Sequence, residues 1–140
     1  KFAKLHRSAL KEEGIRLYKR SVFRKYEEYF YLPRPQAKAD VNWFAFPITV
    51  RETAPFKRSD FCQFLESKKI QTRPYFAGNI LMQPAYSHLV GDMDLSDFPI
   101  AKKVTTDTFF LGTSPVITEE FKAVDPMMKS YLSVLNSIKK

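Results

Sequence analysis

Residues 42–50 read NWFAFPITV, and this stretch decides the fold class. Aromatic and β-branched residues dominate it, which is typical of a β-strand. Side chains alternate along a strand, so one face holds Phe44, Phe46, Ile48 and Val50. Pro47 has no N–H to donate to a neighbouring strand. The stretch therefore predicts a strand that lies at a sheet edge or carries a bulge.

The residues that follow this strand predict a helix, a second strand and an irregular segment. Residues 58–69 have helical periodicity, with Phe61, Phe64 and Leu65 on the inward face. Residues 70–73 read as a short strand. Residues 74–91 are rich in Pro, Gly and Asn, which indicates irregular structure, with one helical turn at 80–83. A strand, a helix and a loop thus follow in close order.

The two ends of the chain add helices and one more strand. Residues 2–31 have helical spacing and end before Pro33. Ser96 is the expected N-cap of a helix at 97–106, and residues 107–114 predict a strand. A last helix is expected at 118–139, kinked or interrupted by Pro126. The order predicts an α/β (α+β) fold in which helices cover a small sheet, with residues 1–140 as a single domain.

Composition narrows the class of protein. The chain has 140 residues, of which 44% are hydrophobic and 27% charged, as in ordinary globular domains. No apolar run approaches the roughly 20 residues of a membrane span. The single cysteine excludes an internal disulfide framework and is typical of a reducing compartment. These features predict a cytoplasmic protein without a membrane partner.

The net charge of +8 is concentrated near the N-terminus. Residues 1–31 hold nine Lys or Arg and four Glu, which leaves five of the eight positive charges in this segment. A basic helix can bind nucleic acid, but it more often forms a solvated face or a surface for an acidic partner. We therefore expect no nucleic-acid partner.

Motifs for catalysis or metal binding are not visible in the sequence. His6 and His88 are too far apart in sequence to form a metal cluster, and Cys62 is interpreted as a structural thiol. There is no glycine-rich phosphate loop, nucleophile elbow or pair of carboxylates at a catalytic spacing. We therefore assign no catalytic residue and no metal ligand.

One constellation remains as a candidate binding site. Arg73 ends a short predicted strand, and its planar guanidinium is suited to a bidentate grip on carboxylate or phosphate. Tyr75 and Phe76 offer ring faces for stacking with a base or sugar. Asn79 and Gln83 can bond hydroxyls or carbonyls. The predicted substrate-binding residues are thus Arg73, Tyr75, Phe76, Asn79 and Gln83.

The same residues have a purely structural interpretation. Arg73 can make an ion pair with Glu66 or Asp107, Phe76 can lie in the core, and Asn79 can cap the next helical turn. The spacing alone does not decide between the two interpretations.

The chain also resembles a known family. The resemblance covers about residues 27–131 and rests on the stretches EEYFYLP, WFAFPITV, DFCQFLESKKI, TRPYFAGN, QPAY and TEEFKAV. These are similar to the DegT/DnrJ/EryC1/StrS sugar aminotransferases and dehydratases. Ala77, Gly78 and Asn79 stand where the aminotransferases more typically have a Pro-Leu-His turn. That difference favours the nucleotide-sugar 3-dehydratases of lipopolysaccharide biosynthesis.

The resemblance implies a fold, a cofactor and partners. The fold would be the small C-terminal domain of the aspartate aminotransferase fold, with residues 1–30 as a helix arriving from a missing large N-terminal domain. The full-length enzyme would be a homodimer that uses pyridoxal phosphate or pyridoxamine phosphate on a nucleotide-sugar. This fragment alone would bind no cofactor and would be inactive. A nucleotide-sugar aminotransferase and a stand-alone basic binding module are the alternatives.

Overall fold

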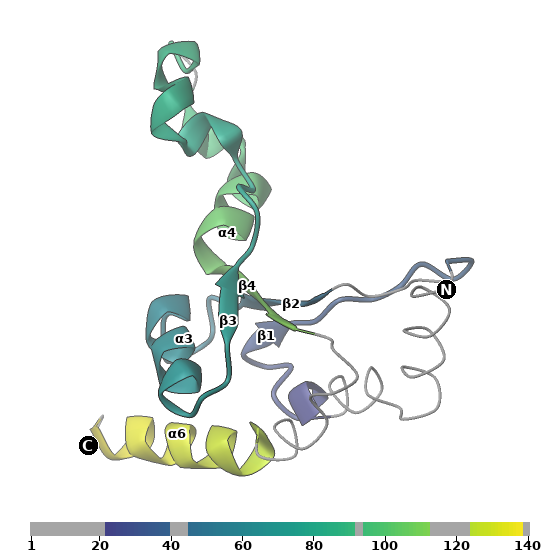
Figure 1. Ribbon diagram of the computed structural model, residues 1–140, viewed down its shortest axis with the longest axis vertical. Helices are drawn as coiled ribbons and strands as arrows, with labels where there is room; N and C mark the ends of the chain where they lie inside the picture. The colour runs from purple at the N-terminus through teal and green to yellow at the C-terminus, as the bar shows by residue number, and fades with distance from the viewer. Residues whose placement is uncertain (1–21, 40–44, 92–93, 113–123, 139–140) are drawn as a thin grey trace.

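The computed structural model describes residues 22–39, 45–91, 94–112 and 124–138, which form a small antiparallel sheet with helices (Figure 1). The sheet has the strand order β1-β2-β4-β3. Its strands are β1 (Phe30–Tyr31), β2 (Ala45–Val50), β3 (Thr72–Pro74) and β4 (Thr108–Gly112). The α-helices are α3 (Arg58–Ser67), α4 (Pro99–Asp107) and α6 (Val124–Ile138). The predicted fold class is confirmed.

The core lies on one face of the sheet, and α3 and α6 contribute to it. Phe46, Ile48 and Val50 alternate with less buried residues along β2, as the sequence predicted. The α3 residues Phe61 and Leu65 are fully buried. The core cluster is completed by residues from every part of the described chain: Val22, Phe23, Tyr26, Phe30, Phe56, Ile70, Phe109, Leu111, Val124 and Met128. Aromatic side chains therefore fill most of the space between sheet and helices.

The prediction that Pro47 places this strand at a sheet edge or at a bulge is wrong, because β2 lies between β1 and β4 and pairs with β4 in continuous register. Pro47 pairs with Phe110 of β4. On the other side, β1 pairs only with Thr49 and Val50 of β2. Pro47 thus lies past the end of β1, where its missing N–H interrupts no ladder between these two strands. The shortness of β1 explains how an internal strand accepts a proline.

The prediction of a helix up to residue 31 is also wrong. Only residues 22–24 are helical in the described part of this segment, and residues 25–29 form turns. Phe30 and Tyr31 form β1 instead, paired with Val50 and Thr49. Phe30 is fully buried, so burial and strand pairing outweigh the helical periodicity of its sequence. Residues 1–21 lie outside the described part of the chain.

Smaller differences appear on the C-terminal side. The expected Ser96 cap is wrong: α4 begins at Pro99 with Phe98 as N-cap, because proline is already set for the first helical position. Ser96 belongs to a short 3-10 helix, η3 (Leu95–Asp97), and its N–H bonds Asp94 Oδ1 at 2.8 Å. Pro126 lies in the first described turn of α6, which continues to Ile138 without a break. Residues 113–123 lie outside the described part.

Residues 75–101 form a projection that we call the arm. It contains three 3-10 helices: η1 (Ile80–Met82), η2 (Pro84–Leu89) and η3. Figure 1 shows the arm extending from the end of β3, past α4 and away from the sheet. The expected turn at 80–83 is confirmed as η1, whereas η2 was not predicted. No helix in the described ranges is long and apolar enough to cross a membrane.

Gly78 allows the start of the arm to pack closely on α4. A Cβ at this position would lie 2.7 Å from Val104 Cγ1 and 2.8 Å from the Ala101 carbonyl oxygen. We expect Gly78→Ala to destabilise the domain by about 1–3 kcal/mol, since one contact is backbone and cannot move aside. Denaturant unfolding measures this change. Gly112→Ala is the control because a Cβ there meets nothing within 4 Å, and equal losses in the two variants would contradict the explanation.

Tyr26 connects the first described turn to α6. Its hydroxyl donates to Asp125 Oδ1 at 3.0 Å, and Lys25 and Lys129 approach Asp125 Oδ2 at 3.3 and 3.2 Å. Burial, reinforced by the bond to Asp125 and its charge, raises the pKa of Tyr26 to about 12. Burial also opposes ionisation of Asp125, but the bonds from Tyr26 and the two lysines keep its pKa below the usual range.

This linkage predicts a loss of stability in alkali. The folded pKa of Tyr26 lies above the unfolded value of about 10, so its stabilising effect is complete below about pH 10 and is lost as pH rises toward 12. We expect Tyr26→Phe to be less stable than the native sequence at about pH 8 and to lose less stability on going to about pH 11. Urea unfolding at the two pH values tests this. Equal losses of stability in the two proteins would contradict it. Burial also raises the pKa values of Tyr29 and Tyr131, so the stability of both proteins keeps some dependence on pH in this range.

Candidate functional site

Arg73 lies in the edge strand β3, exposed, on the face opposite the core. It pairs with Phe110 of β4, which in turn pairs with Pro47 of β2. Directly paired residues share a face of the sheet, and Phe110 alternates with the buried Phe109 and Leu111. The guanidinium therefore belongs to the outer face of the sheet.

The structural interpretation of Arg73 as an ion pair is not realised with either expected carboxylate. Glu66 instead accepts a hydrogen bond from Thr72 Oγ1 at 2.6 Å. Asp107 binds Lys103 Nζ at 3.3 Å. Arg73 is exposed, as a residue that grips a ligand must be before binding.

Tyr75 and Phe76 extend this surface from the end of β3 into the arm. Phe76 is 72% exposed and its ring stacks on Phe110 with centroids 6.3 Å apart. Tyr75, 39% exposed, contacts Phe76 edge-on at 5.9 Å and Phe110 at 6.5 Å. The structure thus brings three of the predicted residues together: the cation of Arg73 lies beside the accessible rings of Tyr75 and Phe76. We call Arg73, Tyr75, Phe76 and Phe110 the aromatic–arginine surface.

Asn79 has a different environment. It is 5% exposed, and its Oδ1 accepts the N–H of Leu81 at 3.0 Å, so it caps η1. Its backbone N–H bonds Thr105 Oγ1 at 2.9 Å, which ties the arm to α4. The side-chain Nδ2 is buried and has no hydrogen-bond partner. These contacts agree with the capping interpretation, and a contact of Asn79 with substrate stays a prediction.

Gln83 joins two of the 3-10 helices. It is half-buried, and it closes η1 and precedes η2. Its backbone N–H bonds the Ile80 carbonyl at 3.0 Å, and its carbonyl accepts from Tyr86 N–H at 2.9 Å. Gln83 therefore shapes the arm through its backbone, and a substrate bond from its amide also stays a prediction.

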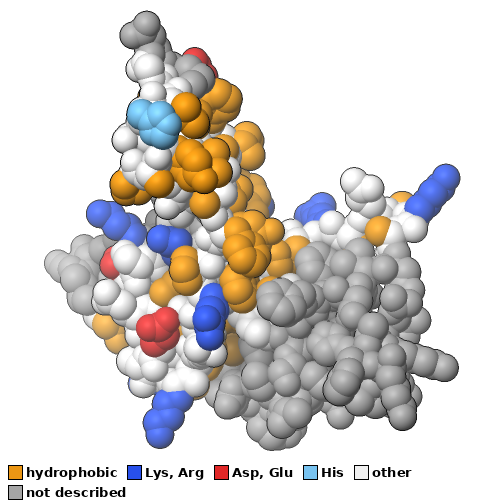
Figure 2. All heavy atoms as spheres, turned by 45° about the horizontal axis from the view of Figure 1, so that its top comes forward, with side chains coloured by type: hydrophobic (Ala, Val, Ile, Leu, Met, Phe, Trp, Pro, Cys, Tyr) orange, Lys and Arg blue, Asp and Glu red, His pale blue; other side chains and the backbone are white. Residues whose placement is uncertain are grey.

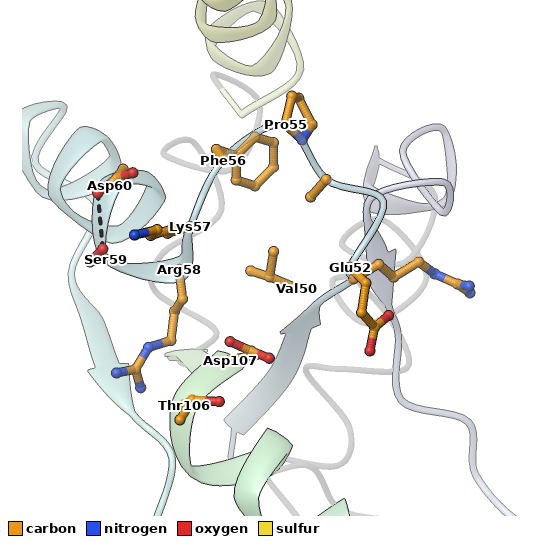
Figure 3. Close-up of a pocket in the computed structure, with 12 residues that line it drawn as sticks. Val50, Glu52, Pro55, Phe56, Lys57, Arg58, Ser59, Asp60, Thr106 and Asp107 are labelled. Carbon is orange, nitrogen blue, oxygen red and sulfur yellow. Dashed lines mark hydrogen bonds between the residues drawn. The ribbon is translucent and has the colours of Figure 1, made fainter. Parts of the chain in front are cut away.

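A hollow of the described surface lies elsewhere. It measures about 660 Å³ and is lined by residues 50–52, 54–60, 106 and 107. Figure 3 shows it as an open space between the segment after β2, the start of α3 and the end of α4. It includes none of the predicted site residues. Sequence reasoning missed it because its walls come from segments about 50 residues apart, and the charged run RETAPFKRSD was its only local signal.

Several charged groups at this hollow are engaged in bonds. Arg58 Nη1 donates to the Thr108 carbonyl at 3.1 Å. Lys103 Nζ lies 2.6 Å from Glu52 Oε1 and binds Asp107 as well. The bond from Lys103 keeps the pKa of Glu52 below the usual range. Such pairs stabilise the junction of β2, α3 and α4.

The remaining reactive residues do not form a site within the described ranges. Burial raises the pKa of the Cys62 thiol, which agrees with a structural role. His88 is exposed at the end of η2. No group of three or more potential metal ligands occurs among the described residues. His6 lies outside them.

Comparison with known proteins identifies the family. The geometry above defines a small α/β domain with an exposed aromatic–arginine surface and no complete catalytic site among its described residues. Residues 1–127 match the model of the DegT/DnrJ/EryC1/StrS aminotransferase family. The chain belongs to this family, as its sequence stretches indicated.

Two curated relatives match part of the chain. The lipopolysaccharide biosynthesis protein RfbH of Salmonella typhimurium is 36% identical over 97 residues, which is 66% of this chain and 21% of that protein. The dTDP-4-dehydro-2,6-dideoxy-D-glucose 3-dehydratase of Saccharopolyspora spinosa is 37% identical over 90 residues, 64% of this chain and 19% of that protein. The chain therefore spans about a fifth of the length of these relatives.

Solved structures confirm the fold. The E. coli GDP-4-keto-6-deoxy-D-mannose-3-dehydratase with bound hydrated PLP has a TM-score of 0.63 at 19% identity, covering 90% of this chain and 31% of the other. An aminotransferase from Psychrobacter cryohalolentis has a TM-score of 0.70 at 13% identity, covering 89% and 34%. The domain thus has the fold of part of these enzymes, which include both dehydratases and aminotransferases.

Proposed function

We propose that this chain is the C-terminal domain of a nucleotide-sugar 3-dehydratase. The full-length enzyme would remove the C3 hydroxyl of a nucleotide-linked 4-keto-6-deoxyhexose in the cytoplasm, in the synthesis of lipopolysaccharide sugars. The observation that carries this proposal is the 37% identity over 90 residues to a protein named as a sugar 3-dehydratase. The relative named for lipopolysaccharide biosynthesis supports the pathway.

The aromatic–arginine surface would bind the nucleotide-sugar. Arg73 presents a planar donor fork that matches two phosphate oxygens, and it is exposed on the outer sheet face. Phe76 offers most of its ring to solvent, which leaves a face for a base or sugar to stack on. We infer that the diphosphate lies near Arg73 and the ring near Phe76.

The cofactor would be pyridoxal phosphate or pyridoxamine phosphate, held outside the described part of this chain. Such a cofactor needs an anion cradle for its phosphate, a carboxylate facing its ring nitrogen, and a lysine or histidine at its reactive carbon. The described residues of the hollow do not supply this set, since Arg58 is bonded to a backbone carbonyl and both Glu52 and Asp107 are bonded to Lys103. The cofactor supplies the electron sink when bound. The residues of this domain would orient the sugar.

A nucleotide-sugar aminotransferase is the second candidate, favoured by the similarity to aminotransferase structures. The two activities differ in the residue at the cofactor: a lysine in an aminotransferase, and a histidine base in the 3-dehydratases that this chain resembles. In either case we expect a homodimer with a large N-terminal domain.

The experiment is a product analysis with the full-length enzyme. Purified protein with pyridoxamine phosphate is given GDP-, CDP- and dTDP-linked 4-keto-6-deoxyhexoses, with and without glutamate. Mass spectrometry of the products separates the candidates. A sugar that has lost its C3 hydroxyl supports the dehydratase, whereas a 4-amino sugar that keeps its C3 hydroxyl supports the aminotransferase and overturns the first proposal.

A further inference from the structure

The arm has the composition of a protein interface. No Lys or Arg occurs between Arg73 and Lys102, although the chain contains 23 of these residues. The only charged side chains in this stretch are Asp92, Asp94 and Asp97. Interface cores are depleted in Lys and enriched in aromatic residues and Met. A solvated surface on so basic a chain would be expected to carry some of its lysines.

Many hydrophobic side chains of the arm are exposed rather than packed. Most of the large hydrophobic residues exposed on the described surface lie in it: Tyr75, Phe76, Ile80, Tyr86, Leu89, Phe98 and Ile100. None of the buried core hydrophobics of the described chain comes from the arm. Figure 2 shows hydrophobic side chains, coloured orange, along the projection down to its base. A contiguous apolar patch of this kind marks a site of association.

We propose that the arm docks on the preceding part of the same, longer polypeptide, the segment that the relatives have and this chain lacks. This inference rests on the proposed function only in assuming that the chain is one domain of a larger enzyme. About four fifths of the relatives' length lies outside the match. A segment of that size is large enough to cover the arm. The tip of the arm would hold the two domains together, while its base lies beside the aromatic–arginine surface.

The position of the arm favours this occupant over a second copy of the same domain. Tyr75 and Phe76 belong both to the aromatic–arginine surface and to the apolar patch of the arm, so the two are continuous. If the preceding domain lies over Arg73 and completes the substrate site, it also covers the base of the arm.

The base of the arm is attached to α4. Asn79 N–H bonds Thr105 and Gly78 packs against Val104. Beyond that point the whole of η2 is exposed. The base thus sets the direction of the arm while its tip, with Tyr86 and Leu89, stays available for contact. The exposed tip can therefore bury its apolar side chains only against another domain.

A photo-crosslinking experiment on the full-length enzyme tests the proposal. The crosslinker p-benzoylphenylalanine replaces Tyr86, and light and heavy-nitrogen proteins are mixed and allowed to exchange subunits before irradiation. We expect crosslinked peptides of a single isotope that join the arm to the preceding domain. Adding Leu89→Asp should lower the yield about tenfold, the loss expected for one apolar contact.

The control is Val134→Asp in α6. Val134 and Leu89 are both 53% exposed, so the two variants differ in position and not in accessibility. We expect Val134→Asp to leave the yield unchanged. Crosslinks of mixed isotope would assign the arm to the partner subunit and overturn the proposal, as would no crosslink at all. Because the readout needs no substrate, an enzyme that docks but does not dehydrate contradicts the proposed function alone.

Discussion

Phe61→Ala should destabilise the domain by about 3–5 kcal/mol, the largest effect we expect for one substitution in this chain. Phe61 is fully buried, and its ring contacts those of Phe30, Phe56 and Phe109 at centroid distances of 5.3, 5.2 and 5.8 Å. These partners come from β1, the segment after β2, and β4. The cavity would therefore open where sheet and helix meet. Guanidinium unfolding followed by circular dichroism measures the loss.

The matched control for this prediction is Phe76→Ala. The same atoms are removed, but Phe76 is 72% exposed and lies in the arm. We expect a change within about 0.5 kcal/mol, as for most surface substitutions. Similar losses in both variants would show that the arm aromatics belong to a second core. That result would contradict the assignment of Phe76 to a binding surface.

Arg73→Lys in the full-length enzyme should lower kcat/KM by tenfold or more with little change in melting temperature. Lysine keeps the charge but loses the planar fork, and one charge-assisted hydrogen bond contributes about 1.5–3 kcal/mol. Stability should be unaffected because Arg73 is exposed and neither Glu66 nor Asp107 pairs with it. Steady-state kinetics on the nucleotide-sugar and a thermal melt measure the two quantities.

Arg34→Lys is the control for this substitution. Arg34 is also exposed, but it lies in the loop after β1, away from the aromatic–arginine surface. We expect native kinetics and native stability. Arg73→Lys with full activity and a lowered melting temperature would mean that the guanidinium serves the fold, and the substrate role would be withdrawn.

The elements that local sequence determines were predicted well. The helix α3 follows from its own periodicity, and β2 follows from alternation, since each packs on the core over its whole length. The failures come from partners distant in sequence. Phe30 joins β1 because Val50 is available to pair with it, which no local pattern records. Pro47 signalled an edge, but only the length of β1 explains why it is tolerated inside the sheet.

The candidate site shows the same division. Arg73, Tyr75 and Phe76 are close in sequence, and the strand that carries them keeps them close in space. Asn79 follows by only a few residues, yet a cap at η1 turns it inward. The hollow between β2, α3 and α4 needs residues about 50 positions apart, so only the tertiary structure reveals it. Spacing thus predicted that Arg73, Tyr75 and Phe76 lie close together, but it did not predict the burial of Asn79.

The shape of β3 has a consequence for how this protein avoids aggregation. An edge strand has unpaired backbone N–H and C=O groups that can pair with another chain, and β3 lies next to exposed aromatic rings. Yet β3 has three residues, one of them the cation Arg73, and it ends at Pro74. Proline gives no N–H to an incoming strand, and the charge penalises its approach. The aromatic–arginine surface thus borders a strand that is too short, and too interrupted by Pro74, to pair with further strands. This would protect the isolated domain from aggregation through its sheet edge.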